Sequence, residues 1–221
     1  MIPCKGVKAL YRTIFWDWNG TLLDDVDYVV RLNNRLFSRW GLEPFATADA
    51  YREVFDFPIR DYYRRVGVTE NIFEDVAQAW SAGYMEGCRA CPLREGAAEA
   101  VARFREAGLR QVVVSASKGE HLSVQVGFYP QLAGAFDSLL GLADIYAASK
   151  VHLAQGYLAA HGLDPAEVVL LGDTCHDHEV AQAVGCGCLL ISGGHQLPAK
   201  LAATGRPVMG SLGQAVDYIL K

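Results

Sequence analysis

The stretch YRTIFWDWNGTLLDD, residues 11–25, decides the fold of this protein. Its first half, residues 11–17, is a short apolar, aromatic and β-branched run that ends in the carboxylate of Asp17, as is typical of a buried strand. The pair Asn19-Gly20 follows and is typical of a turn. We therefore predict a buried strand with an acid at its carboxyl end.

The segment that follows, from Asp25 to about Cys91, has a helical pattern. Apolar residues recur at three- and four-residue spacing from Val29 to Trp40, and Gly41 follows as a stop signal. Residues that favour helix starts recur along the rest of the segment, namely Thr47, Pro58 and Thr69. Trp40 and Trp80 fit apolar helical faces, so we interpret both as core residues. The pattern predicts a block of helices without strands.

The rhythm changes after Pro92, where apolar strand-like runs alternate with helical segments. Strands are predicted at 110–115, 136–140, 167–172, 187–191 and 207–209. Helices are predicted at 96–107, 149–161 and from about 173 to Val184. Such alternation predicts an α/β fold, with a doubly wound, mostly parallel sheet covered on both faces. We expect residues 1–24 and 92–221 to form this core and residues 25–91 to form an inserted all-helical cap.

Composition limits the classes of function. The chain has 221 residues, a net charge of -5 and a pI near 5.7, which argues against a general nucleic-acid binder. No signal peptide or membrane span is visible, so we expect a cytoplasmic protein. Its cysteines are then expected to be reduced thiols, namely Cys4, Cys88, Cys91, Cys175, Cys186 and Cys188.

Chemically active side chains follow the predicted strands. Asp17 ends the first strand, Ser115 ends the second, and Asp173 follows 167–172, with Asp177 four residues further on. Lys150 begins the helix before that strand. Ligand sites in doubly wound sheets lie beyond the carboxyl ends of the strands, so these groups are expected to converge there.

These residue types suit phosphoryl transfer. Three clustered carboxylates need protons or a cation, and hard carboxylate oxygens suit Mg²⁺. Ser115 can donate a hydrogen bond to a phosphate oxygen, and Lys150 can neutralise charge that opposes attack by a carboxylate. Asp17 is then expected to attack phosphorus and to form an aspartyl phosphate that water later cleaves. The expected partner is a small phosphorylated metabolite.

The pattern resembles the haloacid dehalogenase superfamily of aspartate-nucleophile hydrolases. The resemblance spans about residues 11–191 and rests on four motifs, here DWNGT (17–21), VVVS (112–115), Lys150 and GDTCHD (172–177). The helical insertion after the first motif resembles the cap of the phosphoglycolate-phosphatase-like branch. This resemblance implies that Mg²⁺ is held by Asp17, the main-chain carbonyl of Asn19 and Asp173, with Asp177 binding or supporting it. It also implies a phosphatase.

The chain departs from the family at Asn19, where the superfamily has an aspartate that acts as general acid and base. An amide cannot exchange a proton at neutral pH, and such proton transfer is worth about 10²–10⁴ in rate. Three alternatives stay open: a substrate with a good leaving group, a proton from His176 or His178, or slow turnover. A catalytically impaired or non-catalytic phosphate- or partner-binding protein is the competing function.

Several other features have ordinary interpretations. Arg60, Arg64 and Arg65 are expected to be a solvated basic face, although they could reach an anionic substrate. The Cys88–Cys91 pair has no second pair at zinc-binding spacing, and we interpret it as coincidental. Gly193-Gly194 is interpreted as an ordinary loop signal. A phosphonate hydrolase of this family would need a lysine in the cap to form a Schiff base. The cap segment 25–91 has no lysine, which argues against that function. A phosphomutase of this family would need an aspartate at position 19, so Asn19 argues against that function. The helical insertion argues against a receiver-type signalling domain.

Overall fold

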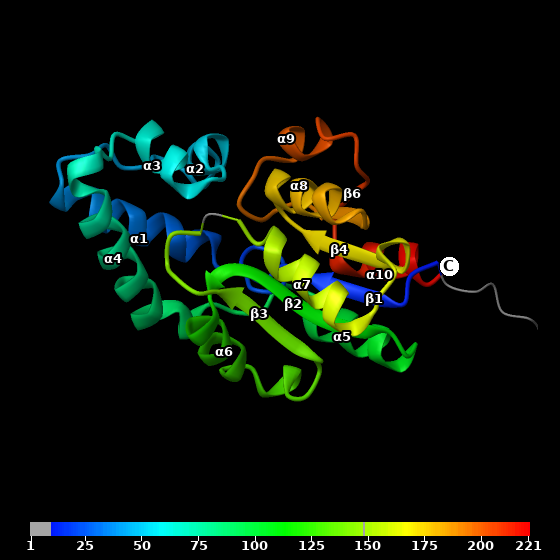
Figure 1. The fold of residues 1–221 in the computed structure, drawn as a ribbon. Helices are drawn as coiled ribbons and strands as arrows, with labels where there is room; N and C mark the ends of the chain where they lie inside the picture. The colour runs from blue at the N-terminus through cyan, green and yellow to red at the C-terminus, as the bar shows by residue number, and fades with distance from the viewer. Residues whose placement is uncertain (1–9, 148) are drawn as a thin grey trace, which may run out of the picture.

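The computed structural model describes residues 10–147 and 149–221, and it shows a parallel sheet with helices on both faces (Figure 1). The strands are β1 Thr13–Trp16, β2 Arg110–Lys118, β3 Ser138–Leu142, β4 Val168–Gly172, β5 Gly187–Ile191 and β6 Val208–Met209. Their order in the sheet is β3-β2-β1-β4-β5-β6, and every neighbouring pair is parallel. The predicted α/β class is confirmed.

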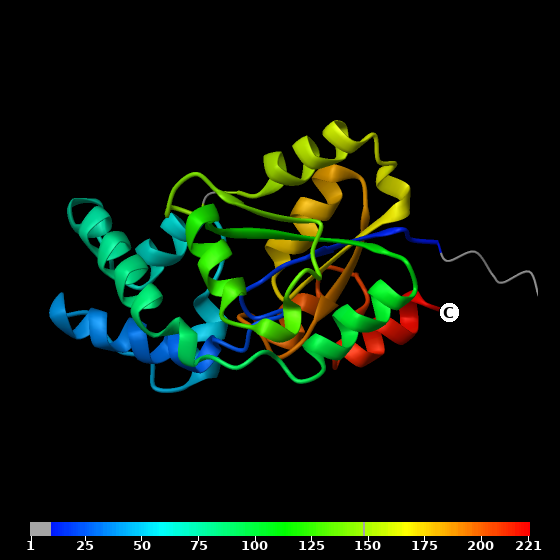
Figure 2. The same ribbon diagram turned by 90° about the horizontal axis from the view of Figure 1, so that it is seen from below.

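The central strands are buried on both faces, as their continuous apolar sequences predict. Trp16 packs on one side of the sheet and Phe15 on the other. The first side is covered by α5 Ala97–Glu106, α6 Gly119–Gly127 and α10 Leu212–Ile219. The second side is covered by α7 Val151–His161, α8 Cys175–Val184 and α9 Pro198–Ala202. Figure 2 shows α7 and α8 on one side of the strands and α5 and α10 on the other.

The strand order changes direction between β1 and β4, which lie side by side in the middle of the sheet. Trp16 is in register with Leu171, and the amide of Asp17 donates to the carbonyl of Leu171 at 2.8 Å. The residues that follow the two strands are therefore brought together at one edge. Ligands in open α/β sheets bind at such a change of direction.

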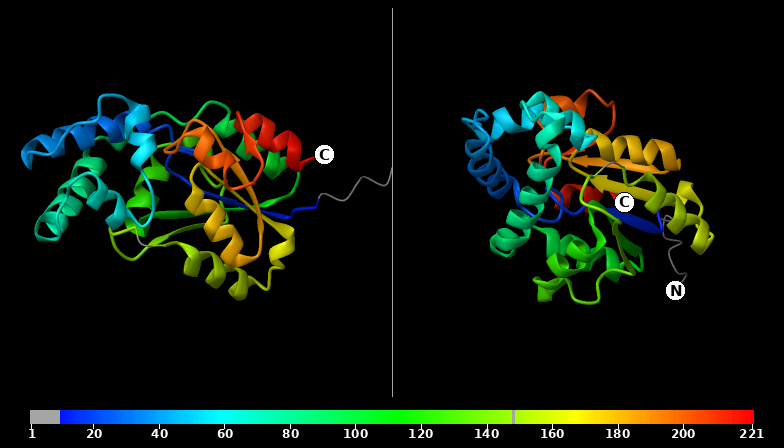
Figure 3. Two further views of the ribbon diagram at one scale, coloured as in Figure 1. Left: turned by 90° about the horizontal axis from the view of Figure 1, so that it is seen from above. Right: turned by 60° about the vertical axis from the view of Figure 1, so that its left-hand side comes forward.

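The helical block predicted for residues 25–91 is present and lies beyond the carboxyl ends of the strands (Figures 1 and 3). Its helices are α1 Val26–Arg39, α2 Ala48–Val54, α3 Ile59–Arg65 and α4 Glu70–Gly87, followed by the short helix η1 Cys88–Ala90. Thr47 caps α2 by accepting from the amide of Ala50, as its residue type predicts. The block has its own apolar core, to which α1, α2, α3 and α4 all contribute.

The block meets the core in several places, of which two lie away from the acidic residues that end the strands. Where the chain enters and leaves the block, Asp24 donates from its amide to the carbonyl of Pro92 at 2.9 Å, and Leu23 pairs with Leu93. A second set of contacts, here called the distal contact, joins residues 52–56 to residues 193–200. Its bonds include Arg52 Nε to the Gly194 carbonyl at 2.8 Å and Lys200 Nζ to Asp56 Oδ2 at 3.0 Å.

Some expectations about elements were wrong. Strand β2 continues to Lys118, so Ser115 lies inside the strand and not at its end. Helices α6, α9 and α10 were not predicted. Cys4 lies outside the described residues, and the other five cysteines are free thiols, including Cys88 and Cys91. Within the described ranges, no helix combines the length and apolar character that crossing a bilayer requires.

Candidate active site

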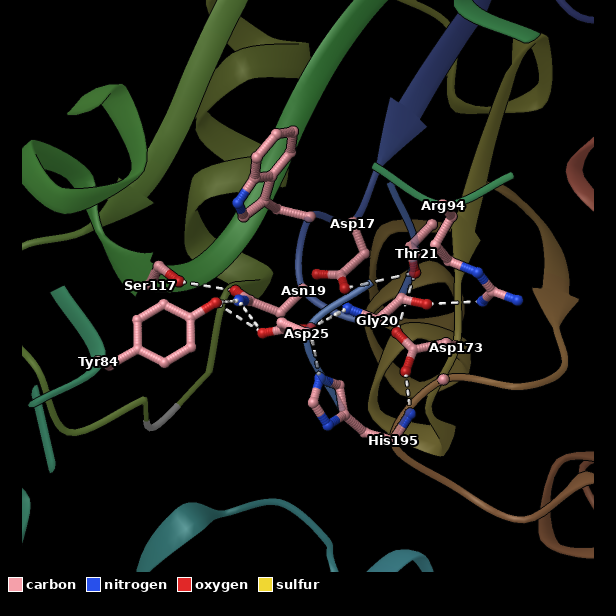
Figure 4. Close-up of polar contacts among 12 residues, drawn as sticks. Asp17, Asn19, Gly20, Thr21, Asp25, Tyr84, Arg94, Ser117, Asp173 and His195 are labelled. Carbon is pink, nitrogen blue, oxygen red and sulfur yellow. Dashed lines mark hydrogen bonds and ion pairs between the residues drawn. The ribbon is translucent and has the colours of Figure 1, made fainter. Parts of the chain in front are cut away.

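Three buried carboxylates gather where β1 and β4 end, and Figure 4 shows two of them, Asp17 and Asp173. Asp17 follows β1, Asp173 follows β4, and Asp177 lies in the first turn of α8. One oxygen from each lies within 4.8 Å of the other two. The structure therefore brings together the three acids that the sequence singled out.

Lys150 precedes the first residue of α7 and reaches into this cluster. Its Nζ lies 2.5 Å from Asp17 Oδ1 and 2.7 Å from Asp177 Oδ1, and its side chain is 2% exposed. Burial alone would lower the pKa of Lys150, but Asp17 and Asp177 raise it, so the ammonium stays charged. Lys150 is thus a fixed positive charge beside the predicted nucleophile.

One lysine among three acids leaves the cluster with excess negative charge. Burial raises the pKa of Asp17 well above its ordinary value; Lys150 opposes this rise, while Asp177 and Asp173 add to it. Burial also raises the pKa of Asp173, and the charge of Asp177 adds to the rise. Burial would raise the pKa of Asp177 as well, but Lys150 holds it below its ordinary value. A divalent cation would satisfy this excess charge, and the donors are the hard oxygens that Mg²⁺ prefers.

Asp173 is held in place by two neighbours. The Thr21 hydroxyl donates to its Oδ1 at 2.9 Å, and the main-chain amide of His195 donates to its Oδ2 at 2.6 Å. Gly194 lies so close that a Cβ there would stand 2.1 Å from Asp173 Oδ2. Gly193-Gly194 lies in a loop, as interpreted, and the missing side chain at Gly194 also makes room for a carboxylate of the site.

Asp177 is tied to the start of α8. Its Oδ2 accepts from the amide and the hydroxyl of Thr174, which forms a capping box. A Cβ at Gly172 would stand 2.0 Å from the Asp177 carboxyl carbon, so this glycine lets the strand end approach the acid. Asp177 therefore holds both Lys150 and the helix terminus.

Two serines of β2, Ser115 and its neighbour Ser117, lie near Asp17. Ser115 is 1% exposed, and its hydroxyl oxygen accepts from the amide of Ser117 at 3.1 Å. Both serines line the same cavity as Asp17 and Lys150. The structure thus brings Ser115, which the sequence singled out, to the same cavity as Asp17 and Lys150.

The side chain of Asn19 is fully engaged (Figure 4). Its amide nitrogen donates to Asp25 Oδ2 at 2.8 Å and lies 2.6 Å from the Tyr84 hydroxyl, which itself donates to Asp25. Its carbonyl oxygen accepts from the Ser117 hydroxyl at 2.9 Å. Asn19 thus bonds to α4, to β2 and to the residue that precedes α1.

Asp25 and His195 form a buried ion pair that the sequence analysis missed. Asp25 Oδ1 lies 3.1 Å from His195 Nε2 and accepts from the amide of Gly20 at 2.9 Å. Burial opposes charge on both groups, yet His195 lowers the pKa of Asp25, and Asp25 raises that of His195. His195 follows the carboxyl end of β5. The rule that ligand sites lie beyond the carboxyl ends of the strands, which identified Asp17, could also have identified His195.

The two histidines that were considered as proton donors lie in different surroundings. His176 is buried and lines the cavity, with its ring stacked on Phe57 at 4.5 Å between centroids. His178 accepts from Arg206 on the outer surface and is absent from the cavity lining. Of the two, only His176 is positioned to contact a ligand.

The cavity itself has a volume of about 140 Å³ and lies between the acids and the helical block. Its core side is polar and contains Asp17, Ser115, Lys150 and His176. Its other side consists mainly of aromatic rings, including Tyr62, Tyr63, Phe73, Trp80 and Tyr84. Trp80 packs against the core of the block, as its helical spacing predicts, and it also lines the cavity.

Comparison with known proteins identifies the family to which the sequence is similar. Residues 14–191 match the family model described as haloacid dehalogenase-like hydrolase. A Synechococcus elongatus protein named phosphoglycolate phosphatase is 24% identical over 191 residues, which cover 83% of this chain and 84% of that protein. A Mycobacterium tuberculosis protein named tyrosine-protein kinase PtkA is 26% identical over 186 residues, and the match covers 83% of this chain and 63% of that protein.

Solved structures share the fold. A haloacid dehalogenase-like family hydrolase from Streptococcus pneumoniae matches with a TM-score of 0.81 at 18% identity, over 94% of this chain and 98% of that chain. CbbY from Rhodobacter sphaeroides in complex with phosphate matches with a TM-score of 0.71 at 19% identity, over 92% and 96%. These likenesses extend across both the sheet and the helical block.

Proposed function

The chain belongs to the haloacid dehalogenase-like hydrolase family, and on that premise we propose that it is a Mg²⁺-dependent phosphohydrolase with Asp17 as its nucleophile. The observation that supports this most is the position of Lys150, whose Nζ lies 2.5 Å from Asp17 Oδ1 at one end of the cavity. A buried ammonium next to a carboxylate lowers the cost of bringing that carboxylate to an anionic phosphate.

The proposed substrate is a small phosphate monoester. Asp17 attacks phosphorus, a new bond forms from its carboxylate oxygen, and the bond to the alcohol oxygen breaks with its electron pair on that oxygen, which takes a proton from a water molecule. Ser115 and Lys150 bind the phosphate oxygens that face them. Water then attacks the aspartyl phosphate, which releases phosphate and regenerates Asp17.

The proposed metal ligands are Asp17, the main-chain carbonyl of Asn19 and Asp173, with Asp177 in support. Mg²⁺ bound there would polarise the phosphoryl group and screen its charge from Asp17. Asp173 is pre-oriented for this role by Thr21 and the His195 amide, and Asp177 by Thr174.

We further propose that residues 25–91 act as a cap over the site. The chain enters and leaves this block through adjacent segments at Leu23 and Leu93, and the rings that line the cavity belong mostly to it. Such an arrangement allows the block to rotate about one place and to control access. The five free thiols among the described residues are consistent with a cytoplasmic setting.

A non-catalytic phosphate-binding protein is the second candidate. The observation in its favour is Asn19, whose amide is built into a network with Asp25, Tyr84 and Ser117 and supplies no acid.

Release of phosphate from p-nitrophenyl phosphate, with millimolar Mg²⁺ and with a chelator, tests the first candidate against the second. We expect Mg²⁺-dependent release that falls about 10³-fold or more in Asp17→Asn. Asp24→Asn is the matched control, because Asp24 is exposed and does not line the cavity, and its rate should equal that of the native protein. Mg²⁺-dependent binding of beryllofluoride without any release of phosphate would instead identify the binding protein.

A further inference from the structure

The half of the cavity that faces away from Asp17 is a wall of aromatic carbon. One face of α4 supplies Phe73, Ala77, Trp80 and Tyr84 at three- and four-residue spacing, and α3 adds Tyr62 and Tyr63. In the proposed chemistry this half receives the alcohol part of the ester, because the phosphate lies against Asp17 and Lys150.

Three of these rings already use their polar ends within the protein. The Tyr62 hydroxyl accepts from Asn33 Nδ2 at 3.0 Å, and Trp80 Nε1 donates to Asn33 Oδ1 at 2.9 Å. The Tyr84 hydroxyl donates to Asp25 at 2.6 Å, as Figure 4 shows. A hydroxyl-rich alcohol such as a sugar would therefore lose its bonds to water and regain few in this wall.

The helical block also offers no positive charge to the cavity. The structure describes all of residues 25–91, and within that range no arginine or lysine lines the cavity. Arg60 and Arg64 contact Glu70, and Arg65 contacts Asp56, each with about half or more of its side chain exposed. The interpretation of these arginines as a solvated face thus agrees with their contacts.

The only carboxylate that the block contributes to the cavity lining is Asp25, and its charge is paired with that of His195. On the core side, Lys118 lines the cavity, but it pairs with Glu120 at 2.7 Å and its side chain is 32% exposed. To pair with Lys118, a substrate carboxylate would have to displace Glu120, and water would screen the new ion pair.

Resting on the phosphatase chemistry proposed above, we infer that the substrate is a phosphate monoester of an uncharged, mostly apolar alcohol, of about one ring in size. The volume sets an upper limit of about one ring, because an apolar cavity of about 150 Å³ in another protein takes up benzene, and the cavity here is about 140 Å³ and must also hold the phosphate. Phosphorylated carboxylates and sugar phosphates are the classes that this wall rejects.

Binding of two non-hydrolysable phosphonates by the full chain with Mg²⁺, measured by calorimetry, tests the inference without turnover. Benzylphosphonate should bind about 10-fold or more tightly than phosphonoacetate, because only the first places a ring against the aromatic wall. Equal affinities, or tighter binding of phosphonoacetate, would overturn the inference and leave the proposed phosphatase standing.

A variant links the preference to the wall itself. Ser81→Arg adds a cation to the cavity lining on α4, and it should shift the ratio of the two affinities toward phosphonoacetate by about 10-fold. Ser38→Arg, at an exposed position of α1 outside the cavity, is the matched control and should leave the ratio unchanged. An unchanged ratio in Ser81→Arg would show that the alcohol does not contact this wall.

Turnover separates this inference from the proposed function. Benzyl phosphate, glycerol 1-phosphate and phosphoglycolate all have alkyl leaving groups, so differences in kcat/KM report binding of the alcohol and not the ease of its departure. The inference expects benzyl phosphate to be the best of the three. Absence of release from these esters and from p-nitrophenyl phosphate would refute the phosphatase, while the phosphonate affinities would still decide the ligand class.

Discussion

The amide nitrogen of Asn19 lies 2.8 Å from Oδ2 of Asp25, inside a network that also holds Tyr84 and Ser117. An aspartate at position 19 would place a second carboxylate against that of Asp25. The residue that departs from the family's pattern is therefore matched to its surroundings, since the amide donates where a carboxylate would repel.

Asn19→Asp should lower the free energy of unfolding by about 1–3 kcal/mol at pH 7 in the absence of metal, because two acceptors would share one buried site. Repulsion raises the pKa of the new acid above that of the unfolded chain. The loss of stability relative to the native protein should therefore grow as the pH rises from about 4. Denaturant titrations at several pH values measure it, and a pH-independent difference would contradict the mechanism.

The same variant should gain catalytic power selectively. A carboxyl group at position 19 can protonate an alkyl leaving oxygen, so the rate for alkyl phosphates should rise about 10²-fold. The rate for p-nitrophenyl phosphate should change little, because its leaving group departs without a proton. Steady-state kinetics on one ester of each kind checks this, and equal effects on both would remove this account of Asn19.

The Asp25–His195 pair predicts a pH dependence of stability. Asp25 raises the pKa of His195, so the folded chain binds that proton more tightly than the unfolded chain does. The contribution is complete below the ordinary value of 6.5 and is lost as the pH rises through the folded pKa. The free energy of unfolding, measured with chelator, should fall over this range in the native protein and not in His195→Gln. The matched control is His152→Gln, at an exposed position, which should keep the native slope.

Gly194→Ala should weaken Mg²⁺ binding by about 10–100-fold, because the new Cβ would stand 2.1 Å from Asp173 Oδ2 and displace that carboxylate. Gly156→Ala on α7 is the control, since nothing lies within 4 Å of its added Cβ. That control should keep native Mg²⁺ affinity and gain up to about 1 kcal/mol in stability. Calorimetric titration with Mg²⁺ compares them, and equal affinities would show that Asp173 does not bind the metal.

Lys200→Ala should loosen the distal contact, where Lys200 Nζ bonds to Asp56 and to the carbonyl of Phe55. The partners are partly exposed, so the loss should be about 0.5–1 kcal/mol, or a roughly two- to five-fold faster local amide exchange. The faster exchange should be confined to residues 52–58 and 193–200. Arg206→Ala, which removes a contact with His178, should leave those segments unchanged. Uniform acceleration along the chain would indicate general destabilisation instead.

The sequence predicts the acid cluster because each acid follows a strand that its apolar run identifies. Parallel strands place such residues at one edge, so Asp17 and Asp173 meet although 156 positions separate them. The length of β2 was not predictable from residues 116–118, whose polar character ends the apolar run that marked the strand. Pairing with β3 extends the strand, since Lys118 pairs with Leu142 across an irregular register.

The Asp25–His195 pair could not be found by periodicity. Asp25 precedes a helix and looks like an ordinary cap residue, and only packing against a loop 170 positions away buries it. Helix α10 is a different case, because its signal was present: Ser211 caps it, and Leu212, Ala215, Val216 and Ile219 have helical spacing. That Trp80 also lines the cavity was not predictable, because periodicity identifies an apolar face but not whether that face meets protein or an empty space.

The distal contact is weak compared with the chain connections at Leu23 and Leu93. Parting it breaks a partly exposed ion pair and a few hydrogen bonds, while the aromatic core of the helical block stays intact. Swinging of the proposed cap as one body also breaks the bonds of Tyr51 to His195 and of Tyr84 to Asn19, and we expect it in the range of microseconds to milliseconds. In the proposed phosphatase, exchange of ester for alcohol at the buried acids would then proceed on that timescale, without local melting of any helix.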